Sequence, residues 1–493
     1  MRRFLILACT FALGCAQVLG LDDFKDGETS SGGNGGGGNG NGGDPSTGGS
    51  GGNPTQGGGG DDGGGGTGGT GGMEPTTGDV AWAYGVGSTL SDAVQDVAVA
   101  PNGEVYVFGT TPDSISFSIG NTVINGPSAW LVKLSATGQL QWSLGFPVTG
   151  TGGPVLFPYG VEATADGVVL ALFGKPQITV NGFPRSGVVV AKIASDGSSG
   201  WTRECGGGEN FKARIGGDLA LDHDGNVIVS SLTNGPMTCA GGAGLSGIVI
   251  TKLNPQGSQM WAKSGSTGYD RTARIAVDST NSIIVTGNTN GVDFTNDPAI
   301  PNIGGAFITK LSAAGGQIWA KQLAPSNPDV NTVRTIVNDA IIVGGSFDGQ
   351  TQFGTEQVTP NGTRDGYVVV LDQTGNYLDH QQIGSDVAVV NTILVNPGSN
   401  LMVGGAFGGT LAFGSDNLTA AGMSDGFILT ANNMGQPVGA FQYGGSGADS
   451  ITSLIMGSEY LIAGGSYTGA VDFGAAELTP FGGNDGMVLG ILP

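Results

Sequence analysis

The sequence predicts an all-β protein: a seven-bladed β-propeller of four-stranded blades, closed by its own N-terminal strand. Three observations predict this fold class: a long repeat, the absence of helical periodicity, and a strand count that balances only in a ring. A repeat over so many units indicates that each unit buries its apolar faces against its neighbours. The repeat is marked by turn glycines at steps of 59, 60, 58, 60 and 60 residues, namely Gly138, Gly197, Gly257, Gly315, Gly375 and Gly435.

Each repeat contains four short predicted strands, here called A, B, C and D. After residue 78 no window shows a sustained apolar period of 3.6 residues, and short runs of β-branched residues alternate with Gly, Asn and Asp instead. In the third repeat the predicted strands are 218–222, 226–230, 248–253 and a run through Trp261. The Asn102-Gly103 pair between strands A and B is a strong hairpin signal, and we expect both of its residues to have positive φ.

The strand count predicts how the ring closes. The chain has seven A, B and C strands, but it ends at Pro493, before a seventh D strand. An additional D-like segment, residues 80–84, precedes the first A strand. We therefore expect this segment to complete the last blade, as in a propeller sealed by its own ends. An open β-solenoid is the alternative, but it would need capping units rather than a strand missing at one end and added at the other.

The repeats resemble the bacterial SBBP type of β-propeller repeat. The matching segments include 103–109 (GEVYVFG), 305–311 (GAFITKL) and 365–371 (DGYVVVL), and the resemblance covers residues 79–493. It implies the propeller fold and a surface or secreted setting. It implies no reaction, because the family shares no catalytic residues.

The N-terminus carries an export signal. Residues 1–14 form a short basic start followed by an apolar run too short to span a bilayer. The sequence Ala12-Leu13-Gly14-Cys15 resembles the lipobox of bacterial lipoproteins, which implies cleavage before Cys15 and acylation of this residue. Two alternatives stay open: cleavage at Cys9, or an ordinary secretory signal with an incidental cysteine. The segment that follows resembles predicted lipoproteins of myxobacteria-like Gram-negative bacteria, and Ala16 favours the outer membrane or cell surface.

Composition indicates a tether and excludes some partners. Residues from about 30 to 72 are nearly all Gly with Asn, Thr, Ser, Pro and Asp, which predicts a disordered linker. We expect residues 15–78 to form a tether between the lipid anchor and the propeller at 79–493. The chain has a formal net charge of -22, which disfavours polyanions, so we expect no nucleic-acid partner and bare anionic lipid surfaces are poor candidates. We expect a monomer, held at the membrane through Cys15, with an unidentified protein or carbohydrate ligand.

Few residues are candidates for chemistry. Cys205 and Cys239 fall in neighbouring connections on the same face, so a disulfide is the preferred interpretation, and a metal site is disfavoured because no histidine is close in sequence. The two histidines, His223 and His380, are predicted to lie three blades apart. The Asp222-His223-Asp224-Gly225 segment resembles half of a calcium loop, but the remaining ligands of such a loop are absent, so a tight turn is preferred. We expect no catalytic residue, no metal ligand and no cofactor.

The repeats divide into four and three. Repeats one to four carry a lysine at the same position of strand C, which we interpret together with the tryptophans of strand D as packing elements. The lysines are Lys133, Lys192, Lys252 and Lys310, and the tryptophans are Trp82, Trp142, Trp201, Trp261 and Trp319. Repeats five to seven lack the lysine and instead share an Asp-Gly pair at the start of strand C, at Asp365, Asp425 and Asp485.

Strand direction predicts where a ligand binds. The B-to-C and D-to-A connections share one face of the ring, and the long connections, such as 347–364 and 407–424, are of the B-to-C type. Loops on a rigid scaffold often carry binding sites, although these loops also fit small accessory hairpins. We expect a non-catalytic binding module. A propeller hydrolase or lyase acting at the channel is one alternative, which requires charged groups from several blades there, and a purely structural envelope component is another.

Overall fold

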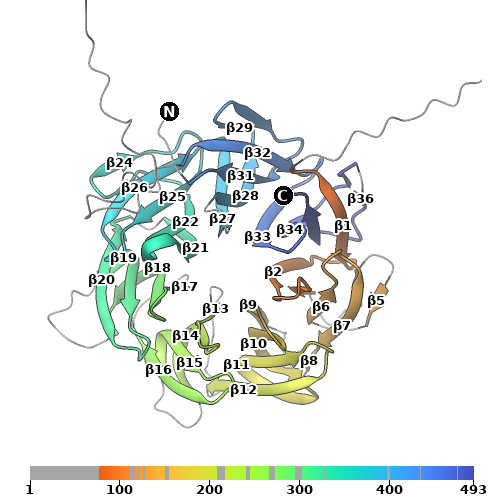
Figure 1. Cartoon of the computed structure of the whole chain (residues 1–493), viewed down its shortest axis with the longest axis vertical. Coiled ribbons are helices and arrows are strands. Elements are labelled where there is room, and N and C mark those ends of the chain that lie inside the picture. The colour runs from red at the N-terminus through yellow and green to blue at the C-terminus, as the bar shows by residue number, and fades with distance from the viewer. Residues whose placement is uncertain are drawn as a thin grey trace, which may run out of the picture. The chain divides into compact units, whose positions relative to one another are not determined.

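A computed structural model of the protein describes residues 77–493 except 112–116, 120–121, 126–127, 150–154, 208–216, 240–244, 266–272, 295–302, 327, 397–399, 434 and 475. The predicted signal segment, Cys15 and nearly all of the predicted tether lie outside the described residues. The described residues belong to one compact unit. They form seven four-stranded antiparallel sheets arranged around a central axis, which confirms the seven-bladed propeller (Figure 1).

Each blade runs from an innermost strand A to an outermost strand D. The A strands are β2 (Ala93–Val99), β9 (Val155–Thr164), β13 (Asp218–Leu221), β17 (Ala273–Val277), β21 (Asp329–Thr335), β27 (Val387–Val395) and β33 (Ser450–Met456). The B strands are β3 (Val105–Thr110), β10 (Gly167–Val180), β14 (Val227–Cys239), β18 (Ile283–Val292), β22 (Ile341–Phe347), β28 (Leu401–Gly408) and β34 (Leu461–Tyr467).

The outer strands follow in the same order of blades. The C strands are β6 (Ala129–Leu134), β11 (Phe183–Ala194), β15 (Leu245–Leu253), β19 (Ile303–Leu311), β25 (Asp365–Leu371), β31 (Asp425–Ala431) and β37 (Asp485–Ile491). The D strands are β7 (Leu140–Phe146), β12 (Ser199–Gly207), β16 (Gln259–Ser264), β20 (Gln317–Ala324), β26 (Tyr377–Ile383), β32 (Pro437–Tyr443) and β1 (Val80–Gly87).

The predicted ring closure is confirmed. Strand β1 pairs antiparallel with β37, so the first strand of the ring is the D strand of the seventh blade. In this pairing Trp82 lies opposite Gly490, and a side chain at Gly490 would collide with the indole ring. The lysine of earlier repeats is therefore replaced by glycine where the N-terminal strand packs.

Several connections carry short additional strands. In blades five to seven the B-to-C connections fold into the accessory hairpins that the sequence suggested: β23 (Thr351–Phe353) with β24 (Glu356–Val358), β29 (Thr410–Phe413) with β30 (Asp416–Thr419), and β35 (Val471–Asp472) with β36 (Glu477–Leu478). In blade one, β4 (Phe117–Ile119) pairs with β5 (Thr122–Ile124), and β8 (Val148–Thr149) pairs with β10. A 3-10 turn, Val337–Asp339, lies in blade five.

The turn type predicted at Asn102-Gly103 is wrong in one respect. Gly103 has a φ of 84°, but Asn102 does not have positive φ. The Gly103 N–H donates to the carbonyl of Ala100, and the Ala100 N–H donates to the carbonyl of Glu104. This pattern is a type I turn followed by a glycine bulge, which needs positive φ at the glycine alone.

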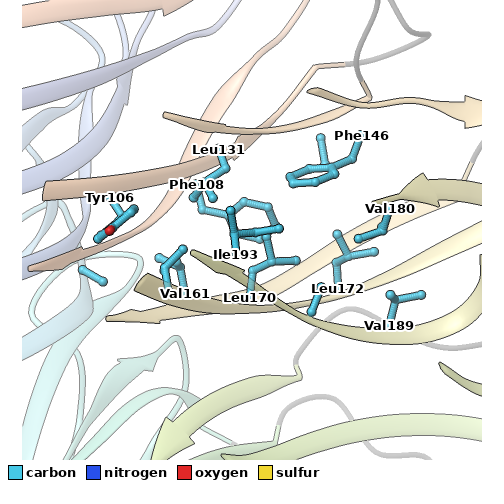
Figure 2. Packing of buried hydrophobic residues seen from close by; sticks show 14 of the residues in the cluster. Tyr106, Phe108, Leu131, Phe146, Val161, Leu170, Leu172, Val180, Val189 and Ile193 are labelled. Carbon is cyan, nitrogen blue, oxygen red and sulfur yellow. The ribbon is translucent and has the colours of Figure 1, made fainter. Parts of the chain in front are cut away.

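The hydrophobic core is divided among the junctions between blades. Seven buried clusters are present, and each is built from two adjacent blades. At the first junction Phe108 and Leu131 of blade one lie close to Leu170 and Ile193 of blade two (Figure 2). Since each blade buries both faces of its sheet, the sequences of the inner strands are nearly continuous runs of apolar residues.

The tryptophans of strand D join one blade to the next. Each indole packs against the C-to-D turn glycine of the following blade, as Trp261 does on Gly315, whose φ is 80°. The Trp261 Nε1 also donates to the Ala313 carbonyl in the same turn at 3.1 Å. The other pairs are Trp82 with Gly138, Trp142 with Gly197, Trp201 with Gly257, and Trp319 with Gly375. The glycine repeat of the sequence is therefore one half of a contact between blades.

The strand C lysines are engaged within the scaffold. Lys252 lies 2.8 Å from Asp222, and both side chains are buried. Its ammonium group also donates to the Ala313 carbonyl of the next blade at 3.2 Å. The equivalent pairs are Lys133 with Glu104, Lys192 with Asp166 and Lys310 with Asp278. This geometry agrees with the packing role expected for the lysines.

Candidate functional site: the central channel

The A strands of all seven blades enclose a channel with a volume of about 510 Å³. This volume falls within the range of small-molecule sites in proteins, about 300–1,000 Å³. In each blade the ladder partner of strand A is strand B, so the opposite edge of strand A faces the channel. Such an edge presents backbone N–H and C=O groups that need partners.

Polar side chains of one blade satisfy the strand edge of the next. The Asp96 Oδ2 accepts the N–H of Val161 at 2.9 Å, and the Asp218 Oδ2 accepts the N–H of Ile275 at 2.9 Å. Three further contacts of this type are Asn331 to the Val390 carbonyl, Asn391 to the Ile451 carbonyl and Thr452 to the Val94 carbonyl. These contacts tie the inner rim of the ring together.

Among the described residues, five charged side chains from five different blades line the channel. They are Asp96, Glu162, Asp218, Arg274 and Arg334. The strand register places them at two levels. Glu162 lies opposite Val169, which lies opposite Lys192 of strand C. In blade five Arg334 lies opposite Ile342, which lies opposite Val370, the residue at the lysine position.

The other three charges occupy the second level, two residues further from the A-to-B turn. Asp96, Asp218 and Arg274 lie opposite Phe108, Ser230 and Thr286 of their B strands. These three residues are equivalent by register.

The three carboxyl groups have raised pKa values. Burial raises the pKa of Asp96, and hydrogen bonds from Val161 and Ser453 offset this only in part. Burial also raises the pKa of Asp218, against the opposing effect of the Arg274 guanidinium. For Glu162, burial and repulsion from Asp96 raise the pKa to about 8, although Arg334 acts in the opposite direction.

Glu162 and Arg334 have few partners in the described structure. The carboxyl group of Glu162 accepts no hydrogen bond from a described residue. The one side-chain bond of Arg334 among the described residues goes to the carbonyl of Val333, at 2.9 Å, and these residues provide no ion pair for it. By contrast Asp96 accepts three hydrogen bonds, from the N–H groups of Val97 and Val161 and from the Ser453 hydroxyl.

The channel charges are residues that sequence reasoning missed. The available signal was a charge within an otherwise apolar A strand, such as Val161-Glu162-Ala163 or Val333-Arg334. The expected site was the loop face, formed by the B-to-C and D-to-A connections. The structure instead assembles charges of both signs from five blades along the axis.

The cysteines meet at the junction of blades two and three. Cys205 is disulfide-bonded. In the ladder between β12 and β14 it lies opposite Cys239. The side chain of Cys239 lies outside the described part of the structure, so the pairing of these two residues stays a prediction.

The histidines do not share a site. His223 lies in the A-to-B turn of blade three, where its backbone N–H donates to Asn281 of the next blade at 2.9 Å. His380 is buried in β26 of blade five and contacts the Tyr377 hydroxyl through Nδ1 at 2.7 Å. They are two blades apart rather than the predicted three, because β26 closes the fifth blade. Among the described residues no group of three or more potential ligands is placed to hold a metal ion.

Comparisons with known proteins give only distant likenesses. No family model and no curated protein matches the chain. Among solved structures, catalytically inactive virginiamycin B lyase from Staphylococcus aureus with quinupristin is 11% identical, with a TM-score of 0.44, covering 83% of this chain and 100% of that one. A putative 6-phosphogluconolactonase from Bacteroides fragilis is 10% identical, with a TM-score of 0.39, covering 70% and 82%. A protein of unknown function from Bacteroides caccae is 9% identical, with a TM-score of 0.35, covering 64% and 89%.

The described residues include no helix with the length and hydropathy needed to cross a bilayer.

Proposed function

We propose that the protein is a non-catalytic binding module that takes up a small polar ligand in its central channel. In this proposal a lipid on Cys15 anchors the chain to the outer membrane or cell surface, and the Gly-rich tether holds the propeller away from the membrane. The SBBP-type repeat and the lipoprotein identity are parts of the proposal that rest on sequence resemblance. A stable anchor requires more than one acyl chain, which an acylated lipoprotein cysteine supplies.

One observation carries the binding site: the convergence of Asp96, Glu162, Asp218, Arg274 and Arg334 from five blades into one channel. The repeat itself does not require a charge at either of these two levels, since the other blades use Ala, Gly, Thr, Ser, Leu or Ile there. A channel that is partly shielded from water and lined by charges of both signs favours a polar ligand with complementary charged groups.

The hydrogen bonding of the aspartates favours binding over catalysis. Both oxygens of Asp96 and of Asp218 accept backbone N–H groups, so these carboxylates hold adjacent blades together. A catalytic base needs a lone pair free to reach its substrate. The hydrolase or lyase alternative is favoured by Glu162 alone, because a carboxyl group with a pKa of about 8 retains a proton that it can donate near neutral pH.

Ligand capture tests the proposal. The full-length protein is incubated with the low-molecular-weight fraction of a cell-envelope extract, and retained molecules are identified by native mass spectrometry. We compare the Glu162→Gln/Arg334→Gln variant with the control Glu477→Gln/Arg185→Gln, whose residues lie outside the channel. A compound retained unchanged by the wild type and the control, but not by the channel variant, supports the proposal. A chemically altered product supports the enzyme alternative, and equal or absent retention in all three proteins refutes channel binding.

The anchor is tested separately. Mass spectrometry of the mature N-terminal peptide should show an acylated Cys15 as the first residue. An unmodified residue downstream of Cys15 would refute the anchor and leave the channel proposal unaffected.

A further inference from the structure

Two of the channel charges, one acidic and one basic, form no ion pair with any described residue. Glu162 lies on β9 of blade two and Arg334 on β21 of blade five, at equivalent positions of their A strands. In a ring of seven, these two blades are separated by two blades on one side and three on the other. The two strands accordingly lie on opposite sides of the central axis (Figure 1).

No described residue connects the side chains of Glu162 and Arg334. The two side chains form no salt bridge with each other, although the charge of Arg334 acts to lower the pKa of Glu162. The other described channel charges are held by neighbouring blades. Asp96 and Asp218 accept the N–H groups of Val161 and Ile275, and the Arg274 guanidinium donates to the Gly217 carbonyl at 3.3 Å. Glu162 and Arg334 are therefore the two described channel charges that no other blade holds.

Charge complementarity indicates which groups the ligand carries. The guanidinium of Arg334 attracts an anionic group, and the carboxyl group of Glu162, once ionised, attracts a cationic group. Neither side chain forms an ion pair with a described residue. A ligand that carries one charge of each sign therefore supplies a partner to both.

Resting on the proposed function, we propose that the channel binds a zwitterion, with a carboxylate on Arg334 and a protonated amine on Glu162. A guanidinium matches a carboxylate with two parallel N–H···O bonds, which suits Arg334 to this role. Glu162 loses its proton when the ammonium group arrives, and the resulting carboxylate accepts hydrogen bonds from that group. Free amino acids and short peptides share this chemistry.

A peptide panel tests the inference. We titrate the full-length protein with alanine, tri-alanine, N-acetyl-tri-alanine and tri-alanine amide by isothermal titration calorimetry at pH 7. Each charge-assisted hydrogen bond contributes about 1.5–3 kcal/mol, so removing either terminal charge should weaken binding by about 10- to 100-fold. Comparison of alanine with tri-alanine shows whether the span of the channel selects a free amino acid or a peptide.

The variants assign the ends of the ligand. Arg334→Gln should lose the preference for a free carboxylate while keeping the preference for a free amine, and Glu162→Gln should show the reverse. Arg185→Gln and Glu477→Gln are the controls and should bind as the wild type does. Proton release, measured in buffers of different ionisation enthalpy, should accompany binding to the wild type and vanish in Glu162→Gln.

Two results would overturn the inference. Equal binding of capped and free peptides would show that the channel takes a polar ligand of another class, which leaves the proposed function intact. Binding of no member of the panel would also overturn it, and the extract experiment then decides the proposed function independently. If either variant fails to fold, the comparison of capped and free peptides on the wild type still decides the inference.

Discussion

Replacing Glu162 with Gln should change how the stability of the propeller depends on pH. The pKa of Glu162 is raised from 4.5 to about 8 by burial and by Asp96. Between these two values the folded protein retains a proton that the unfolded chain has released. The free energy of unfolding of the wild type therefore falls as the pH rises through this window. Glu162→Gln keeps the shape of the protonated side chain but cannot ionise, so it lacks this contribution.

The size of the effect follows from the shift. Each pKa unit corresponds to 1.36 kcal/mol, so the wild type should lose at most about 2.6 kcal/mol between pH 6 and pH 9 through this group. Glu162 is only partly shielded from water in the channel, which lowers the expected loss to about 2 kcal/mol. The difference in stability between Glu162→Gln and the wild type should grow by that amount over the same range.

Urea denaturation followed by tryptophan fluorescence at pH 6, 7, 8 and 9 measures this difference. The control is Glu477→Gln on β36, an exposed carboxyl whose replacement should shift all four points equally. Parallel curves for Glu162→Gln and the wild type would refute the reasoning, because they would show that Glu162 is already ionised at pH 6. A difference that shrinks with rising pH would contradict the sign of the shift.

Three further predictions concern the scaffold. Lys252→Ala should destabilise the protein by about 3–5 kcal/mol, because it leaves the buried Asp222 carboxylate without its counter-ion, whereas Lys263→Ala on the exposed side of β16 should have little effect in the same urea titration. Trp261→Ala should cost about 3 kcal/mol through the loss of the contact with Gly315, and Trp261→Phe should recover part of it; equal stability of the three proteins would contradict a role in joining blades. Deleting β1 should leave β37 as an open edge and lower the melting temperature markedly, with association visible by gel filtration; an equally stable monomer would contradict closure by the N-terminal strand.

Much of the fold was predictable because strand identity and strand order depend on local patterns. The closing role of residues 80–84 followed from counting D strands, and the β1 to β37 ladder confirms it. The turn geometry at Asn102-Gly103 was less predictable, because Asn-Gly occurs both in two-residue turns and in turns with a glycine bulge. The ladder of the flanking strands, which the sequence does not specify, decides between them.

The channel site could not be predicted, because it depends on which residues become equivalent once the ring closes. Glu162 and Arg334 are 172 residues apart in the chain, and each resembles an ordinary exposed charge in an edge strand. Only the register of two A strands, together with the positions of blades two and five in the ring, places them opposite each other. Histidines, cysteines and acidic loops are the features with recognisable sequence motifs, and the described channel lining contains none of them.

The division of the repeats into four and three reflects two ways of joining blades. A contact between a tryptophan and a turn glycine joins blade seven to blade one, and the same contact joins each successive pair of blades up to blades four and five. All of these contacts lie at the face of the A-to-B and C-to-D turns. Beyond this point the aromatic contact ends, and the residue before each strand C aspartate accepts a backbone N–H from the next blade instead. These bonds join Arg364 to Ala388, Ser424 to Asp449 and Asn484 to Asp92.

The two kinds of contact together cover all seven junctions, and the second kind fixes the loop face. Asp365, Asp425 and Asp485 each accept an N–H from their own B-to-C connection four residues earlier. Loops held at both ends in this way, and folded into hairpins, are poorly suited to adapt to a partner. The channel is bordered by the fixed A strands and contains Glu162 and Arg334, the two described channel charges that no other blade holds. Its position at the one place where all seven blades meet explains why five blades can each contribute a different charge without disturbing the repeat that builds the ring.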